Sequence, residues 1–171
     1  MEVNSRWKLA WAERPWEEAS NFNPMFCAEL IGRAVGDYWK SCKSPLNFAI
    51  SFLVLPLILH EATRDALPRR SDVAFGSWVV DKNLLLADFP DRVNRLRPIT
   101  REAILFAIQH ELLAIQDGGL VVGDMPISPS GTLSRTTDDV TDARNAARLL
   151  GRWFANQKTQ SSILQGMGVT P

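Results

Sequence analysis

The 171-residue sequence has little cysteine, a single tyrosine and no excess of charge of either sign. Cys27 and Cys42 are too few for a disulfide framework and lack the CxxC spacing, so we expect a cytoplasmic protein in a reducing compartment. Its 19 Lys and Arg residues balance 19 Asp and Glu residues. A neutral chain excludes a polybasic nucleic-acid coat, although a local basic patch remains compatible with it.

Motifs that carry chemistry are also missing. His60-Glu61 and His110-Glu111 begin like a zincin motif, but Arg64 and Ala114 stand where its second histidine is required. The phosphate-binding GxxxxGK[ST] loop and the GxSxG nucleophile motif are absent. We therefore predict no metal, no cofactor and no enzymatic activity. The enzymatic alternative is a Cys27 nucleophile paired with a histidine, although a thiol inside an apolar helix is usually inert.

One apolar run, residues 46–59, has to be compared with the length and composition of a membrane-spanning helix. It is shorter than the roughly 20 residues that cross a bilayer as a helix. Asn47 and Ser51 lie inside it, and Pro56 interrupts it. We therefore predict a buried core helix and no membrane association. The first 16 residues carry charges throughout and do not resemble a secretory signal.

The remaining patterns predict a mainly α fold with one small β-hairpin. Asn23 and Pro24 are typical of a helix start, and Ser44-Pro45 predicts a second helix that Pro56 should kink. Short helices are expected from residue 71 to Pro98, followed by a helix that Thr100 caps. Residues 114–122 predict the hairpin, and residues 138–158 predict a long C-terminal helix.

The domain organisation follows from these elements. Residues 1–22 form a Trp-rich N-terminal arm, and residues 23–171 form a single helical domain. Within it, residues 71–122 have the order of a winged helix-turn-helix, with short helices, a capped helix and then a hairpin. The expected recognition helix, residues 101–113, is apolar on nearly every side. Base readout needs a polar face, so a winged-helix-like part used for packing or partner binding is favoured.

An arginine stripe marks the C-terminal helix. Arg144, Arg148 and Arg152 follow one another at helical spacing, and no Asp or Glu lies three or four residues from any of them. The stripe is either a solvated face or a contact surface for nucleic-acid phosphates or an acidic partner. Three arginines would give only a modest, salt-dependent affinity for DNA.

The six tryptophans divide into two groups. Trp39, Trp78 and Trp153 lie in helical patterns and are expected in the core or at its rim. The other three lie in the arm and are candidate partner-binding anchors, since tryptophan is enriched in interface hot spots: Trp7, Trp11 and Trp16. The alternative is that the arm folds back over its own domain.

Four segments of the chain together resemble a known family. They are NPMFCAELI (23–31), PLNFAISFLVLPLILHEATRDALP (45–68), TREAILFAIQHELLAI (100–115) and ARLLGRWFA (147–155). The chain resembles the middle component of three-component ABC ATPase systems, bacterial conflict loci related to Lamassu-type antiphage defence. Residues 1–22 have no counterpart in this resemblance.

The resemblance implies a non-enzymatic adaptor subunit. Its partners would be an SMC/Rad50-like ABC ATPase and an effector, often a nuclease, with DNA sensed through the complex and touched directly only weakly. The all-round apolar helices at 46–59 and 101–113 agree with it, because we expect them to leave apolar surface for neighbouring subunits. The alternative function is a free-standing winged-helix DNA-binding transcription regulator.

Overall fold

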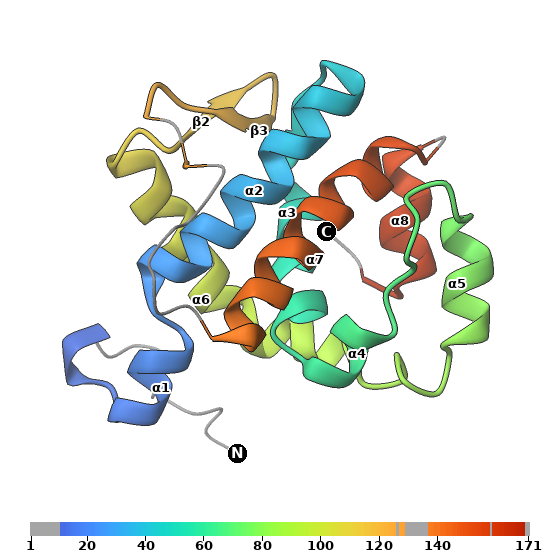
Figure 1. Ribbon diagram of the computed structural model, residues 1–171, viewed down its shortest axis with the longest axis horizontal. Helices are drawn as coiled ribbons and strands as arrows, with labels where there is room; N and C mark the ends of the chain where they lie inside the picture. The colour runs from blue at the N-terminus through green and yellow to red at the C-terminus, as the bar shows by residue number, and fades with distance from the viewer. Residues whose placement is uncertain (1–10, 126, 129–136, 158, 170–171) are drawn as a thin grey trace.

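The computed structural model describes residues 11–125, 127–128, 137–157 and 159–169. The described chain is mainly helical and carries a small β-hairpin, as predicted, which a third strand extends into an antiparallel sheet (Figure 1). In chain order the elements are η2 (Trp11–Glu13), α1 (Trp16–Asn21), α2 (Pro24–Cys42), β1 (Leu46–Asn47), α3 (Phe48–Ile58), α4 (Glu61–Asp65), α5 (Phe75–Asp81), α6 (Phe89–Gln109), β2 (Leu113–Gln116), β3 (Gly119–Val122), α7 (Asp138–Ala155) and α8 (Gln160–Gly166).

Helix α2 begins where its sequence signal predicts. The Asn23 side chain accepts a hydrogen bond from the Met25 backbone N–H, and Pro24 occupies the first helical position, where no N–H is needed. The helix ends at Lys43, which adopts a left-handed φ of 56°. Leu30, Ala34 and the other inward residues of this helix are buried in the core.

The predicted start of the next helix at Ser44-Pro45 is wrong. Residues 46–47 form strand β1, in which Leu46 pairs with Leu120 of β3. Asn47 then caps α3 by accepting a hydrogen bond of 2.8 Å from the Ala49 N–H. Pro56 lies in the last turn of α3, and the helix ends two residues later, at Ile58. A strand pairing with a distant segment overrides the local helix signal here.

Helix α3 lies in the middle of the fold, so the expectation that residues 46–59 leave much apolar surface uncovered is wrong for most of this helix. Ile50, Leu53, Leu57 and most of its other side chains are fully buried by α2, α6, α7 and α8 around it. An apolar helix needs a partner on every side, and this chain supplies those partners itself. In the described part of the chain, no helix combines the length and the apolar character needed to span a bilayer.

Helix α6 also differs from the prediction of separate short helices. It runs unbroken from Phe89 to Gln109, with Pro98 in its interior and Thr100 donating a hydrogen bond to the Leu96 carbonyl. Pro98 lies on the exposed face, so water can hydrate the carbonyl that lacks an N–H partner. The expected helix start at Thr100 is therefore wrong. The winged-helix-like assignment of residues 71–122 remains a prediction.

The predicted hairpin is confirmed by the pairing of β2 with β3. Gln116 pairs with Gly119, and the two turn residues between them, Asp117 and Gly118, have φ values of 49° and 73°. Positive φ at both positions is the geometry of a tight type I′ turn. β1 adds to the other edge of β3, so the strand order is β1-β3-β2.

Helix α7 packs alongside α2 (Figure 1). Gly151 of α7 lies in close contact with the backbone of α2. A Cβ atom added to Gly151 would lie 2.2 Å from the Ala34 carbonyl oxygen, so only glycine allows this contact. The helix starts at Asp138, as predicted, and the Thr137 side chain caps it by accepting a hydrogen bond from the Val140 N–H. It ends at Ala155, three residues before the predicted end at 158.

Aromatic residues pack together in the core near the C-terminal end of α7. Trp153 is fully buried, and its ring centroid lies 4.9 Å from that of Phe75 and 5.1 Å from that of Trp78. The Trp153 indole N–H donates to the Val73 carbonyl at 2.7 Å, and that of Trp78 donates to the Ala66 carbonyl at 2.8 Å. The core positions of Trp78 and Trp153 are confirmed, and Trp39 is half-buried at the rim.

Candidate functional site

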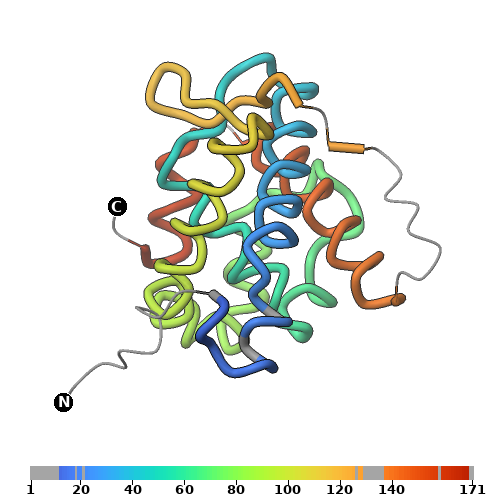
Figure 2. The backbone as a smooth tube through the Cα atoms, turned by 90° about the vertical axis from the view of Figure 1, so that its left-hand side faces the viewer, coloured from blue at the N-terminus to red at the C-terminus, as the bar shows by residue number. Residues whose placement is uncertain are grey.

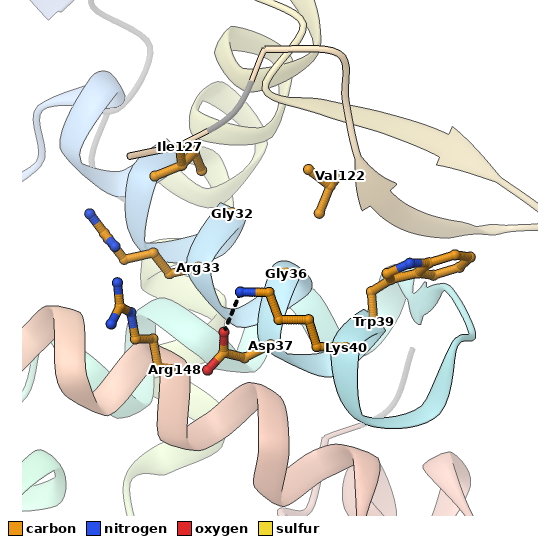
Figure 3. Close-up of a pocket in the computed structure, with 9 residues that line it drawn as sticks. All are labelled: Gly32, Arg33, Gly36, Asp37, Trp39, Lys40, Val122, Ile127 and Arg148. Carbon is orange, nitrogen blue, oxygen red and sulfur yellow. Dashed lines mark ion pairs between the residues drawn. The ribbon is translucent and has the colours of Figure 1, made fainter. Parts of the chain in front are cut away.

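A groove of about 350 Å³ runs along α2 beside α7 and the end of β3 (Figure 3). We call it the α2 groove. Its lining is Gly32, Arg33, Gly36, Asp37, Trp39, Lys40, Val122, Ile127 and Arg148. Figure 3 shows Arg33 and Arg148 at one end and Trp39 at the other, with the Asp37–Lys40 pair between them. The groove thus combines cationic groups with an aromatic ring.

The two glycines of α2 form the floor of this groove. A Cβ at Gly32 would lie 2.1 Å from the Ile127 Cδ1 atom, and one at Gly36 would lie 3.8 Å from a Val122 methyl group. Their spacing predicts the close approach of another backbone, but side chains occupy this space instead. The close backbone contact of α2 is made by Gly151 of α7.

The predicted arginine stripe lies against α2, with Glu29 as the partner of Arg144. The Arg144 Nε donates to Glu29 Oε1 at 2.6 Å, and its Nη2 donates to Oε2 at 3.1 Å. Arg33 donates to the same carboxylate at 2.8 Å. Burial acts to raise the pKa of Glu29, but the hydrogen bonds and charges of Arg144 and Arg33 outweigh it and lower that pKa below its ordinary value.

Arg152 and Arg148 continue the stripe towards the groove. Arg152 pairs with Asp37, which also pairs with Lys40 at 3.6 Å, and Arg148 lines the α2 groove itself. Two stripe residues therefore have carboxylate partners on the neighbouring helix, which spacing within α7 alone could not reveal. Binding of nucleic acid or an acidic partner by Arg144, Arg148 and Arg152 stays a prediction.

The arm tryptophans are described unevenly. Trp7 and the side chain of Trp11 lie outside the described residues, while Trp16, the first residue of α1, is 83% exposed. The arm nevertheless contacts the domain, because the buried Arg14 forms an ion pair of 2.7 Å with Glu102 of α6. Figure 2 shows this N-terminal segment at the opposite end of the molecule from the hairpin.

The cysteine and the two histidines considered for catalysis are buried or make contacts within the fold. Cys27 is fully buried, and burial, followed by the charge of Glu102, raises the pKa of its thiol to about 12 despite the opposing effect of Arg14. A thiol in this setting does not ionise near neutral pH and makes a poor nucleophile. His60 caps α4 by accepting from the Thr63 N–H, and His110 packs on the Phe106 ring.

No cluster of three or more metal-ligating side chains occurs among the described residues. The fold defines the described chain as a mainly α domain with a small antiparallel sheet.

The comparisons with known proteins then identify the family. A family model described as "ABC-three component (ABC-3C) system Middle Component 3" matches residues 11–171, so the chain belongs to this family. The chain is thus a component of a multi-subunit ABC ATPase system, and the resemblance inferred from sequence is confirmed. The match begins at residue 11, so the expectation that residues 1–22 have no counterpart is wrong for residues 11–22. Searches of the curated proteins and of the solved structures gave no match.

Proposed function

We propose that this chain is a non-enzymatic adaptor that bridges an SMC/Rad50-like ABC ATPase and an effector, expected to be a nuclease, in a cytoplasmic antiphage defence complex. The observation that carries the proposal is the family match over residues 11–171, which makes the chain the middle component of a three-component system. A subunit that stands between two others needs at least two contact surfaces.

Trp16 is the anchor we propose for one of these surfaces. It is 83% exposed, and the Arg14–Glu102 ion pair two residues earlier fixes the chain against α6. A large ring held near a fixed point loses little conformational entropy on binding, which is why tryptophan dominates interface hot spots. Trp7 and Trp11, which precede Trp16 in the sequence, are further anchors in this proposal.

The arginine stripe supports a more modest role in the proposal. Arg144 and Arg152 join α7 to α2 through Glu29 and Asp37, which keeps the α2 groove in shape. Removal of either arginine would therefore change both the groove and the charge of the surface. DNA is reached chiefly through the ATPase, and any direct contact by the stripe is weak.

Co-purification tests the adaptor function. The tagged full chain is co-expressed with the ABC ATPase and effector genes of its own locus, and the retained subunits are quantified. We expect both subunits in stoichiometric amounts and a clear loss of one of them with Trp16→Ala. Leu84→Ala is the matched control, because Leu84 is 90% exposed and lies outside the arm. Retention of neither subunit by the unaltered chain would contradict the proposal.

A winged-helix DNA-binding transcription regulator is the second candidate function. It is favoured by the exposed arginines of α6, the helix before the hairpin: Arg95, Arg97 and Arg101. Sequence-selective duplex binding with a steep salt dependence would support it. Equal and weak affinity for every duplex at low salt would exclude it.

A further inference from the structure

We propose that a second groove, formed by α3, α6 and α8, binds an extended peptide segment of a partner subunit that carries a large apolar side chain beside at least two carboxylates. We call it the α6 groove. Its lining is Phe48, Ala49, Phe52, Val93, Arg97, Arg101, Leu164 and Val169. The inference rests on the adaptor function and adds the chemistry of the partner to it.

The floor of the α6 groove is apolar. Phe48 is 39% exposed at the start of α3, and its ring packs edge-on against Phe52 with the centroids 5.5 Å apart. Leu164 and Val169 add aliphatic side chains to the lining. The volume is about 290 Å³, at the lower end of the range for small-molecule sites. A groove of this size suits one or two large side chains of a peptide better than a cofactor.

The rim of the α6 groove carries positive charge that the described chain leaves uncompensated. Arg97 and Arg101 are one helical turn apart and exposed. Among the described residues, Arg97 donates only to the Asn94 side chain, and Arg101 has no ion pair or side-chain hydrogen bond. None of the described residues that line the groove is acidic.

Eight other arginines among the described residues differ from Arg97 and Arg101 because they form ion pairs. Ion pairs with Asp or Glu hold Arg14, Arg33, Arg64, Arg70, Arg92, Arg95, Arg144 and Arg152. Helices α3 and α8 contain no charged residue, and Glu102, the acidic neighbour of Arg101 in sequence, pairs with Arg14 of the arm. Within the described part of the chain no carboxylate complements the rim, so the proposed peptide supplies it, and carboxylates match the planar guanidinium fork.

A peptide fits these observations better than a nucleic acid strand. A strand needs a basic track along its backbone and stacking platforms for successive bases. The α6 groove offers one pair of cations on one rim, and its floor combines two phenylalanines with aliphatic side chains. A peptide with a large apolar side chain flanked by acidic residues matches both the apolar floor and the two arginines of the rim.

A peptide array tests the inference with the full chain. Overlapping 15-residue peptides (a length chosen for the array) cover the ATPase and effector subunits of the locus, and a labelled thymidine oligonucleotide is measured in parallel by fluorescence anisotropy. We expect capture of peptides that combine a large apolar residue with neighbouring Asp or Glu. The captured peptides should bind the double variant R97Q/R101Q with about tenfold lower affinity.

The matched control is R69Q/R70Q, which removes the same charge from exposed positions outside the groove. It should bind the peptides as the unaltered chain does, and thermal melting verifies that both double variants are folded. Capture of no acidic peptide, equal loss in both double variants, or binding of the oligonucleotide in place of peptides would overturn the inference. If the three subunits still co-purify in that case, the adaptor function stands and the α6 groove is not its contact.

Discussion

Gly151→Ala tests the packing of α7 on α2, on which both the α2 groove and the paired arginines depend. The added Cβ would lie 2.2 Å from the Ala34 carbonyl oxygen, 2.9 Å from the Tyr38 nitrogen and 3.0 Å from the Ala34 carbonyl carbon. All three are backbone atoms, so no side-chain rotation relieves the contact. The two helices must move apart to accommodate one methyl group.

The magnitude follows from two opposing effects. Overpacking of a tight interior contact costs about 1–3 kcal/mol, and a clash with backbone on this scale belongs at the upper end. Alanine is more favourable than glycine inside a helix by about 1 kcal/mol. We therefore expect Gly151→Ala to lower the free energy of unfolding by about 2 kcal/mol, which corresponds to a Tm lower by about 4–8 °C for a domain of this size.

Gly76→Ala is the matched control for this prediction. Gly76 lies in α5, and a Cβ there would meet nothing within 4 Å. The same substitution should stabilise the protein by about 0.5–1 kcal/mol, because the backbone entropy of glycine is removed without a clash. Thermal melting followed by circular dichroism measures both variants. A Tm for Gly151→Ala equal to or above that of the unaltered protein would refute the packing argument.

Two further predictions concern ionisable groups. The pKa of Glu29 is lower in the folded protein, so its contribution to stability is present above its unfolded pKa and is lost as the pH falls through its folded pKa. Glu29→Gln should therefore cost about 1–3 kcal/mol at neutral pH and flatten the acid limb of a denaturation series; an unchanged limb would contradict this. Iodoacetamide at pH 8 should label the exposed Cys42 and not the buried Cys27 in the native protein, and both after unfolding, as counted by mass spectrometry. Rapid native labelling of Cys27 would contradict its burial.

Local signals predicted the elements whose causes are local. Asn23 with Pro24 predicted the start of α2, and the Asp117-Gly118 turn predicted the hairpin, because a cap and a tight turn depend on adjacent residues. The start of α3 was not predictable in this way. It depends on the pairing of Leu46 with Leu120, a contact between distant segments.

The candidate sites also combine features that the local sequence predicts with features that depend on contacts between distant segments. The spacing of Arg144, Arg148 and Arg152 correctly placed them on one helix, but Glu29 and Asp37 on α2 are reached only through helix packing. The α6 groove was missed because a break at Pro98 was expected. With α6 taken as one helix, Arg97 and Arg101 are one turn apart, a signal that the sequence already contains.

The central claim is that this chain works as the middle member of a larger assembly. Native mass spectrometry of the complex, isolated through a tag on this chain from cells that carry its whole locus, tests that claim most directly. We predict one assembly that contains the ABC ATPase, the effector and this chain in fixed stoichiometry. A free monomer of this chain, with neither of the other gene products bound, would contradict the account.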